Sequence, residues 1–135
     1  MERVGRGYLP GVFKNPVAPS DSVFRILAVI CLDVIIDGDV DYSILFSNVT
    51  VEEGAKVRYS IIMPGTTIKA GAVVEYSIVA ENAVIDEGAV VGESPEACEN
   101  LDNWGVTVIG EKVTIGKKAF VKAKEMIDTD VKEAE

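Results

Sequence analysis

A 17-residue repeat runs through the middle of the chain and constrains its fold more than any other feature. Residues 51–67 read VEEGAKVRYSIIMPGTT, and residues 68–84 read IKAGAVVEYSIVAENAV. A third copy opens with IDEGAVVGE at Ile85, and VIIDGDVDYSILFSNVT at 34–50 is a weaker copy in front of them. Because a unit this short buries its apolar face only against its neighbours, the repeat predicts a solenoid.

Aligned copies place apolar residues in columns. The first column is Val34, Val51, Ile68 and Ile85, and the second is Val40, Val57, Val74 and Val91. A third side carries Ile44-Leu45-Phe46, Ile61-Ile62-Met63 and Ile78-Val79-Ala80. β-Branched residues dominate and the helical period is missing, so each coil is predicted to contain three short strands of about four residues.

The corners between these strands hold residues that tolerate a positive φ. They are Asp37, Gly54, Gly71 and Gly88 after the first side, and Asn48, Gly65 and Asn82 after the third. Small residues follow the first set, at Gly38, Ala55, Ala72 and Ala89. The sequence therefore predicts an all-β protein, a single-stranded parallel β-helix of triangular section, about 25–30 Å long at about 4.8 Å per coil.

We expect residues 34–128 to form the β-helix domain and residues 1–33 to be an irregular segment that leads into the first coil. Within that segment, VFRILAVICLD is an apolar run too short to span a membrane, and it is interpreted as a strand pair that begins the first coil. The start of the chain lacks the pattern of a signal peptide, so none is expected.

The repeat is interrupted after Glu93 by SPEACENLDNWG, which predicts a loop near 93–105 with Trp104 folded back as an anchor. Strict hexads then resume, but their corners hold Lys112, Lys118 and Lys124. Lysine is a poorer turn residue than Gly or Asn, so we expect a less regular last coil. The charged tail, 129–135, should fray and act as a solvated end cap.

Composition excludes several functions. A net charge of −9 and a pI near 4.5 argue against nucleic-acid binding, which needs clustered Lys and Arg. Cys31 and Cys98 lie far apart without metal-ligand spacing, so free thiols in a reducing cytoplasm are expected. We therefore expect a cytoplasmic protein with no nucleic-acid or membrane partner.

The chain contains no histidine. Many solenoids of this shape are acyltransferases with a histidine base, and others bind zinc through histidines; neither mechanism is available to this chain. Glu52, Glu53, Asp86 and Glu87 are expected at solvated corners, and no phosphate-binding glycine motif is present. The sequence thus predicts no catalytic, cofactor-binding or metal-binding residue.

Two segments carry a family resemblance: SIIMPGTTIKAGA at 60–72 and the closing GVTVIGEKVTIGKKAFVKAKEMID. Over about residues 34–128 the chain resembles the C-terminal left-handed β-helix of bacterial glucose-1-phosphate adenylyltransferase. The resemblance implies the left hand, subunit association as a homo-oligomer or with the enzyme's own catalytic domain, and allosteric control by a sugar phosphate.

The catalytic domain of that family would bind Mg²⁺ and ATP, and nothing in this chain matches it. The chain alone is therefore expected to be inactive, either as a piece of the full enzyme or as a chain that has lost its catalytic half. Two alternatives stay open: a stand-alone hexapeptide-repeat acyltransferase, and a purely structural β-solenoid that polymerises end to end.

Two sets of side chains are candidates for a contact surface. Tyr42, Tyr59 and Tyr76 form a column at one corner, and are interpreted either as an interface or as rings that stack along the solenoid with wet hydroxyls. Five lysines gather in the last coil and suit a phosphate effector or a solvated face. They are Lys112, Lys117, Lys118, Lys122 and Lys124.

Overall fold

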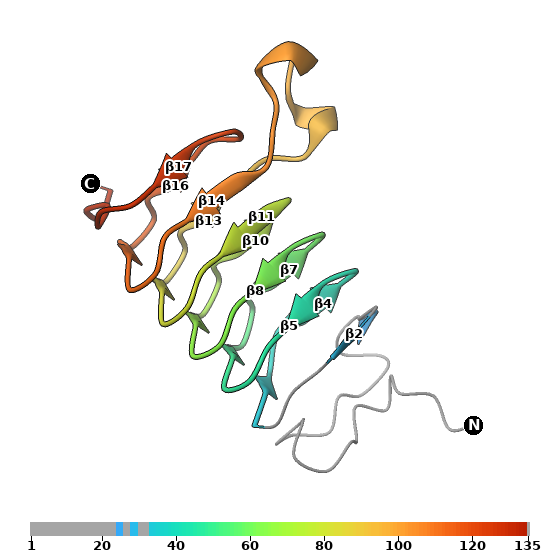
Figure 1. Cartoon of the computed structure of the whole chain (residues 1–135), viewed down its shortest axis with the longest axis vertical. Helices are drawn as coiled ribbons and strands as arrows, with labels where there is room; N and C mark the ends of the chain where they lie inside the picture. The colour runs from blue at the N-terminus through green and yellow to red at the C-terminus, as the bar shows by residue number, and fades with distance from the viewer. Residues whose placement is uncertain (1–23, 26–27, 30–32, 135) are drawn as a thin grey trace.

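The computed structural model describes residues 24–25, 28–29 and 33–134, and it confirms an all-β parallel solenoid of about five turns (Figure 1). All strand pairs are parallel and belong to three sheets, here named A, B and C. The chain passes through A, B and C in turn, and each strand pairs with its counterpart in the next coil. Each sheet is thus one side of a triangular prism.

The strands contain two or three residues, shorter than the expected four. Sheet A consists of β1 (Phe24–Arg25), β4 (Asp39–Asp41), β7 (Lys56–Arg58), β10 (Val73–Glu75), β13 (Val90–Val91) and β16 (Phe120–Val121). Sheet B consists of β2 (Ala28–Val29), β5 (Ile44–Leu45), β8 (Ile61–Ile62), β11 (Ser77–Val79), β14 (Thr107–Ile109) and β17 (Met126–Ile127). Sheet C consists of β3 (Ile35–Ile36), β6 (Thr50–Val51), β9 (Thr67–Ile68), β12 (Val84–Ile85) and β15 (Thr114–Ile115).

From β3 to β16, each strand has one apolar side chain that points into the prism and is buried. The second predicted column is confirmed, with Val40, Val57, Val74 and Val91 in register on sheet A. On sheet B the inward residues are Leu45, Ile62, Val79 and Ile109. Apolar, mostly β-branched side chains stack in these columns because equivalent positions repeat at the spacing between strands, about 4.8 Å.

The first predicted column is wrong at its N-terminal end. Val51 pairs with Ile36, not with Val34, because the corner between β3 and β4 is two residues shorter than the corresponding later corners. Asp37 and Gly38 therefore do not match Gly54 and Ala55. A Cβ on Gly38 would lie 2.4 Å from the Ala55 carbonyl oxygen, so only glycine fits this tight corner.

At the later corners the chain turns at a residue with left-handed backbone. Gly54, Gly71 and Gly88 have φ of 80°, 72° and 69° between sheets C and A, and Asn48, Gly65 and Asn82 have 62°, 79° and 55° between sheets B and C. Lys112, Lys118 and Lys124 adopt the same conformation at φ of 61°, 58° and 72°. The expected irregularity of the last coil is therefore wrong: the ladders above hold its backbone in register, although left-handed lysine costs about 1–2 kcal/mol.

A ladder of buried hydroxyls runs inside the corner between sheets A and B. The Ser60 hydroxyl donates to the Arg58 carbonyl at 2.8 Å and accepts the Ser77 N–H at 3.2 Å. Ser43 does the same one coil earlier, and its hydroxyl accepts the Ser60 N–H at 3.2 Å. Each serine thus satisfies a buried N–H that the turning strand leaves without a backbone partner.

The interruption after Glu93 is a loop that rises from the corner between sheets A and B (Figure 1). It contains two single-turn 3₁₀ helices, η2 (Pro95–Ala97) and η3 (Leu101–Asn103). Trp104 anchors it as expected, since its indole N–H donates to the Glu93 carbonyl at 2.7 Å. The Glu93 carboxylate also accepts the Ala123 N–H at 3.1 Å, which ties the loop to the last coil.

The C-terminal tail does not fray over 130–134. Val131 forms a parallel bridge with Ile115 and packs against the core, while Asp130 Oδ1 accepts the Thr114 N–H at 2.8 Å. The Ala134 N–H donates to the Lys117 carbonyl at 2.8 Å. The expectation of fraying is wrong because the edge of sheet C offers unpaired backbone groups, which the tail satisfies.

At the other end, β1 and β2 pair with β4 and β5, so the VFRILAVICLD run does begin the first coil. The rest of the predicted irregular segment, at 1–23, 26–27 and 30–32, lies outside the described residues, as does Cys31. No helix among the described residues is long and apolar enough to cross a bilayer.

We expect Ser60→Ala to lower the free energy of unfolding by about 1–3 kcal/mol, because the Ser77 N–H then stays buried without an acceptor. Ser94→Ala is the matched control, since the Ser94 side chain makes no capping hydrogen bond. Urea unfolding followed by circular dichroism measures both variants. Equal midpoints for the two would contradict the structural role of the ladder.

Truncation after Thr129 should expose the edge of sheet C. The Thr114 and Gly116 N–H groups donate to Asp130 Oδ1 and to the Val131 carbonyl, so both amides should exchange at least tenfold faster in the shortened chain. The Val84 N–H, which donates to the Val113 carbonyl one coil earlier, serves as the internal control. Hydrogen exchange followed by NMR gives the rates, and unchanged Gly116 protection would show that the tail is not docked.

Candidate functional site

The three outer sides of the prism differ in chemistry. Sheet A presents charged side chains in cross-strand pairs: Asp39 lies beside Lys56 and Asp41 beside Arg58, and the Arg58 guanidinium is 3.7 Å from the Glu75 carboxylate. Sheet C presents mostly threonine, as at Thr50, Thr67 and Thr114. Sheet B differs from sheet A in charge and from sheet C in polarity, because the outward residues of its strands are apolar.

The outward positions of sheet B and its two borders form a surface that we call the apolar face. Its central column is Ile44, Ile61, Ile78, Val108 and Met126, which occupy one register position on five successive strands. The column on the side of sheet A is, by register, Tyr42, Tyr59, Tyr76, Val106 and Lys124. The column on the side of sheet C is Phe46, Met63, Ala80, Gly110 and Asp128.

Lys124 and Asp128 are the only charged residues among these fifteen positions, and both lie in the last coil. The central isoleucines are half-buried, whereas Met126 is 78% exposed. A contiguous uncharged surface is unusual on a chain with 26% charged residues, and such patches mark contacts with other molecules. This face is therefore the candidate functional site.

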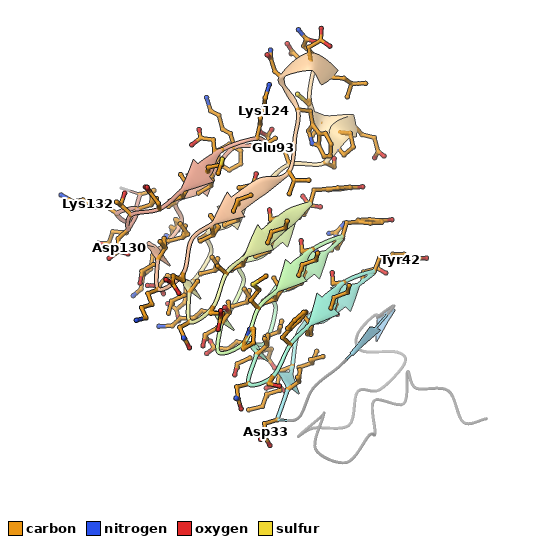
Figure 2. All side chains as sticks on the ribbon, viewed as in Figure 1. Asp33, Tyr42, Glu93, Lys124, Asp130 and Lys132 are labelled. Atoms are coloured by element: carbon orange, nitrogen blue, oxygen red, sulfur yellow. The ribbon has the colours of Figure 1, made fainter. Side chains whose placement is uncertain are left out.

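The tyrosine column stacks along the solenoid. Ring centroids are 5.3 Å apart for Tyr42 and Tyr59 and 4.8 Å apart for Tyr59 and Tyr76, with 12° between the planes in both pairs. Trp104 from the loop closes the stack by meeting Tyr76 edge-on, with centroids 5.6 Å apart. The stacking interpretation is thus confirmed. Tyr42 and Tyr59 stay 39% and 48% exposed, and Figure 2 shows the Tyr42 side chain projecting outward from the solenoid.

The tripeptides Asp41-Tyr42-Ser43 and Arg58-Tyr59-Ser60 show why the rings project outward. Each tyrosine has φ near 48°, which turns the chain, and the following serine points inward to the hydroxyl ladder. A tyrosine in this conformation costs about 1–2 kcal/mol relative to the usual backbone. Stacking with its neighbours, at about 0.5–1.5 kcal/mol per pair, offsets that cost.

Burial raises the pKa of the Tyr76 phenol above 10.0, and the neighbouring Tyr59, Glu96 and Glu75 raise it further. A neutral phenol is favoured here because ionisation would place a negative charge beside two carboxylates. The hydroxyl therefore stays a hydrogen-bond donor at neutral pH.

The five lysines of the last coil do not gather on one surface. Lys112 lies at the corner between sheets B and C, Lys117 and Lys118 between C and A, and Lys122 and Lys124 between A and B. The hexads place one corner every six residues, so the five lysines are divided among the three corners of the prism. No phosphate-binding cluster is assembled from all five.

The acidic corner residues have structural partners. Glu52 Oε1 accepts the Ala70 N–H at 3.1 Å, Asp86 lies 3.8 Å from Lys69, and Glu87 lies 3.8 Å from Lys117. Cys98 is a free thiol in the loop. Within the part of the chain that the structure describes, no three Cys, Asp or Glu side chains are placed to hold a metal ion.

The sequence patterns identified the tyrosine column but not the apolar face. The triplets at 44–46 and 61–63 are predicted as one apolar side of the coil, without a distinction between its inner and outer surfaces, and only Leu45 and Ile62 at their centres are fully buried. The signal was present as alternation: in a strand, residues i and i+2 share one face, so Tyr, Ile and Phe or Met at i, i+2 and i+4 belong together.

These features define a class: a parallel β-helix built from hexapeptide repeats, with an apolar outer side. Residues 20–109, about two thirds of the chain, match the family model described as GlmU-like, C-terminal hexapeptide. The chain belongs to this family, and the helix is left-handed. No curated protein and no solved structure gives a significant match.

The raised pKa of Tyr76 gives a prediction at alkaline pH. Because the folded-state pKa lies above the unfolded value, the phenol stabilises the fold below about pH 10 and this contribution is lost as pH rises through the folded-state pKa. In a titration followed by absorbance at 295 nm, Tyr76→Phe should remove a phenol that ionises above pH 10. Tyr42→Phe is the control, and a wild-type curve for Tyr76→Phe would contradict the assignment.

Proposed function

We propose that this chain is the C-terminal assembly and regulatory domain of a glucose-1-phosphate adenylyltransferase, which makes ADP-glucose and pyrophosphate from ATP and glucose 1-phosphate in glycogen biosynthesis. The observation that carries the proposal is the Ser-Ile-Ile-Met-Pro-Gly string at 60–65, which narrows the resemblance within hexapeptide-repeat proteins.

The place of that string in the fold supports the proposal. Ser60 belongs to the hydroxyl ladder, Ile61 and Met63 lie on the apolar face, and Gly65 turns the following corner at φ 79°. A Cβ on Gly65 would collide with the Asn82 side chain of the next coil. The string thus contains both residues that form the corners of the solenoid and residues on the apolar face, and an assembly domain needs both.

In this role the domain packs against its own catalytic domain or sister subunits in the cytoplasm, and Mg²⁺ and ATP belong to the catalytic domain. A sugar-phosphate effector would meet at most one or two of the last-coil lysines at any corner, because Lys112, Lys118 and Lys124 lie at three different corners. Other domains would therefore supply part of the effector site.

The isolated chain is expected to release no pyrophosphate from ATP and glucose 1-phosphate above the buffer blank, in a coupled phosphate assay with a complete adenylyltransferase as positive control. Clear turnover would overturn the proposal. Protection from thermal unfolding by acetyl-CoA would instead favour an acyltransferase, and sedimentation as long filaments would favour a purely structural solenoid.

A further inference from the structure

We infer that the apolar face binds the apolar face of a second copy of this chain, with the two solenoids side by side and their coils in the same order. This inference deepens the proposed function, since it names the partner and the surface of assembly. It rests on the distribution of charge and side-chain size over the face.

Charge selects the face. Two chains of net charge −9 repel one another, and the repulsion is smallest where the surfaces in contact carry no charge. Sheet A presents Asp39, Asp41 and Glu75 outward, whereas four of the five coils of the apolar face present none. Burial of half-exposed Ile44, Ile61 and Ile78 then supplies the favourable free energy.

Symmetry fixes the direction. In a closed dimer a two-fold axis relates the copies, and for two faces in contact this axis lies in the plane between them. An axis parallel to the solenoid keeps coil order and places the tyrosine column of one copy over the Phe46 column of the other. The central column then faces itself, rung by rung.

This arrangement pairs the two charged residues of the face. Lys124 lies in the tyrosine column and Asp128 in the Phe46 column of the same coil. Each Lys124 therefore faces Asp128 of the other copy, and the dimer contains two such pairs. The alternative axis, across the solenoid, would reverse coil order. It would place Asp128 over Phe46 and Lys124 over Tyr42, and bury both charges without partners, which is costly.

Side-chain size agrees with the same arrangement. Val106, 46% exposed, would face Gly110, where the surface is hollowed between Val108, Gly110, Met126, Ile127 and Asp128. Tyr76 would face Ala80, which is small, and Tyr59 would face Met63, whose flexible thioether packs well on a ring. Large side chains therefore meet small or adaptable ones on three coils.

The face is modest in size. Five strands at about 4.8 Å and five residue positions at about 3.3 Å give a projected area of roughly 400 Å² per copy, against about 800 Å² for a standard interface. We therefore expect a reversible dimer of the isolated chain, half formed at about 100 μM, that other domains would strengthen.

Sedimentation equilibrium between about 5 μM and 1 mM tests the pairing with two matched variants. Ile61→Glu, in the centre of the face, should weaken the dimer at least tenfold, whereas Val73→Glu, a half-exposed valine on sheet A, should leave it unchanged. Circular dichroism and thermal melting check that both variants fold. A wild-type chain that stays monomeric at 1 mM, or an Ile61→Glu variant that dimerises like Val73→Glu, overturns the inference.

Cysteine cross-linking tests the direction in a background with Cys31→Ser and Cys98→Ser. Met126→Cys should form a covalent dimer on mild oxidation, because the central column faces itself on every coil only when coil order is kept. Phe120→Cys, exposed at 53% on sheet A, is the control and should stay monomeric. Equal cross-linking of the two, or none at Met126→Cys, contradicts the arrangement.

A charge exchange completes the test. Lys124→Asp alone should weaken the dimer several-fold, and the double variant Lys124→Asp, Asp128→Lys should restore it, while no rescue rejects the assigned pair. These results are separable from the proposed function. Pyrophosphate release by the isolated chain would reject the proposed role as an inactive domain of an adenylyltransferase but would not affect the proposed dimer. An inactive chain that stays monomeric would reject the dimer but not the proposed role.

Discussion

The solenoid depends on one constraint: every backbone N–H that leaves a short strand at a corner must find an acceptor, either within its own turn or in the adjacent coil. Strands of two or three residues supply few ladder bonds of their own, so the corners carry much of the backbone pairing. Left-handed residues turn the chain there, and the buried hydroxyls of Ser43 and Ser60 accept the N–H groups that have no backbone acceptor. The regular inward columns follow from this, because each coil is held directly above the last.

The same constraint separates the roles of neighbouring residues. At the corner between sheets A and B, a left-handed tyrosine turns the chain outward and the next serine turns inward, so a single dipeptide builds both a surface and an interior ladder. Repetition at 17 residues then converts each dipeptide into a continuous strip. The charged side, the threonine-rich side and the apolar face all arise because residues of similar type recur at the same position in each 17-residue repeat. Family membership fits a scaffold of this kind, whose sides are free to specialise.

The sequence was sufficient for the fold class and for the inward columns, because apolar periodicity and glycine or asparagine corners are local signals. It was insufficient at three places. The contraction at Gly38 moves Val34 out of register with Val51, although Val34 stays buried in the core, since a two-residue deletion inside a polar corner leaves the apolar pattern unchanged. Lysine corners were judged by intrinsic preference, which the ladders of adjacent coils override. The apolar face is not separated from the interior in the sequence, because both surfaces of sheet B are apolar and hydrophobicity alone does not distinguish them.

The equal length of the regular coils has a consequence for how such a chain evolves. Duplication of one 17-residue segment would add a complete rung, of about 4.8 Å, without disturbing the rungs on either side. Duplication of repeats would therefore set the length of each outer side, while substitutions at outward positions would set its chemistry. The loop between Glu93 and Trp104 shows that a corner also accepts an excursion, since the coil closes again on the far side with its register intact. Reach, surface chemistry and added loops are thus inherited independently in this architecture.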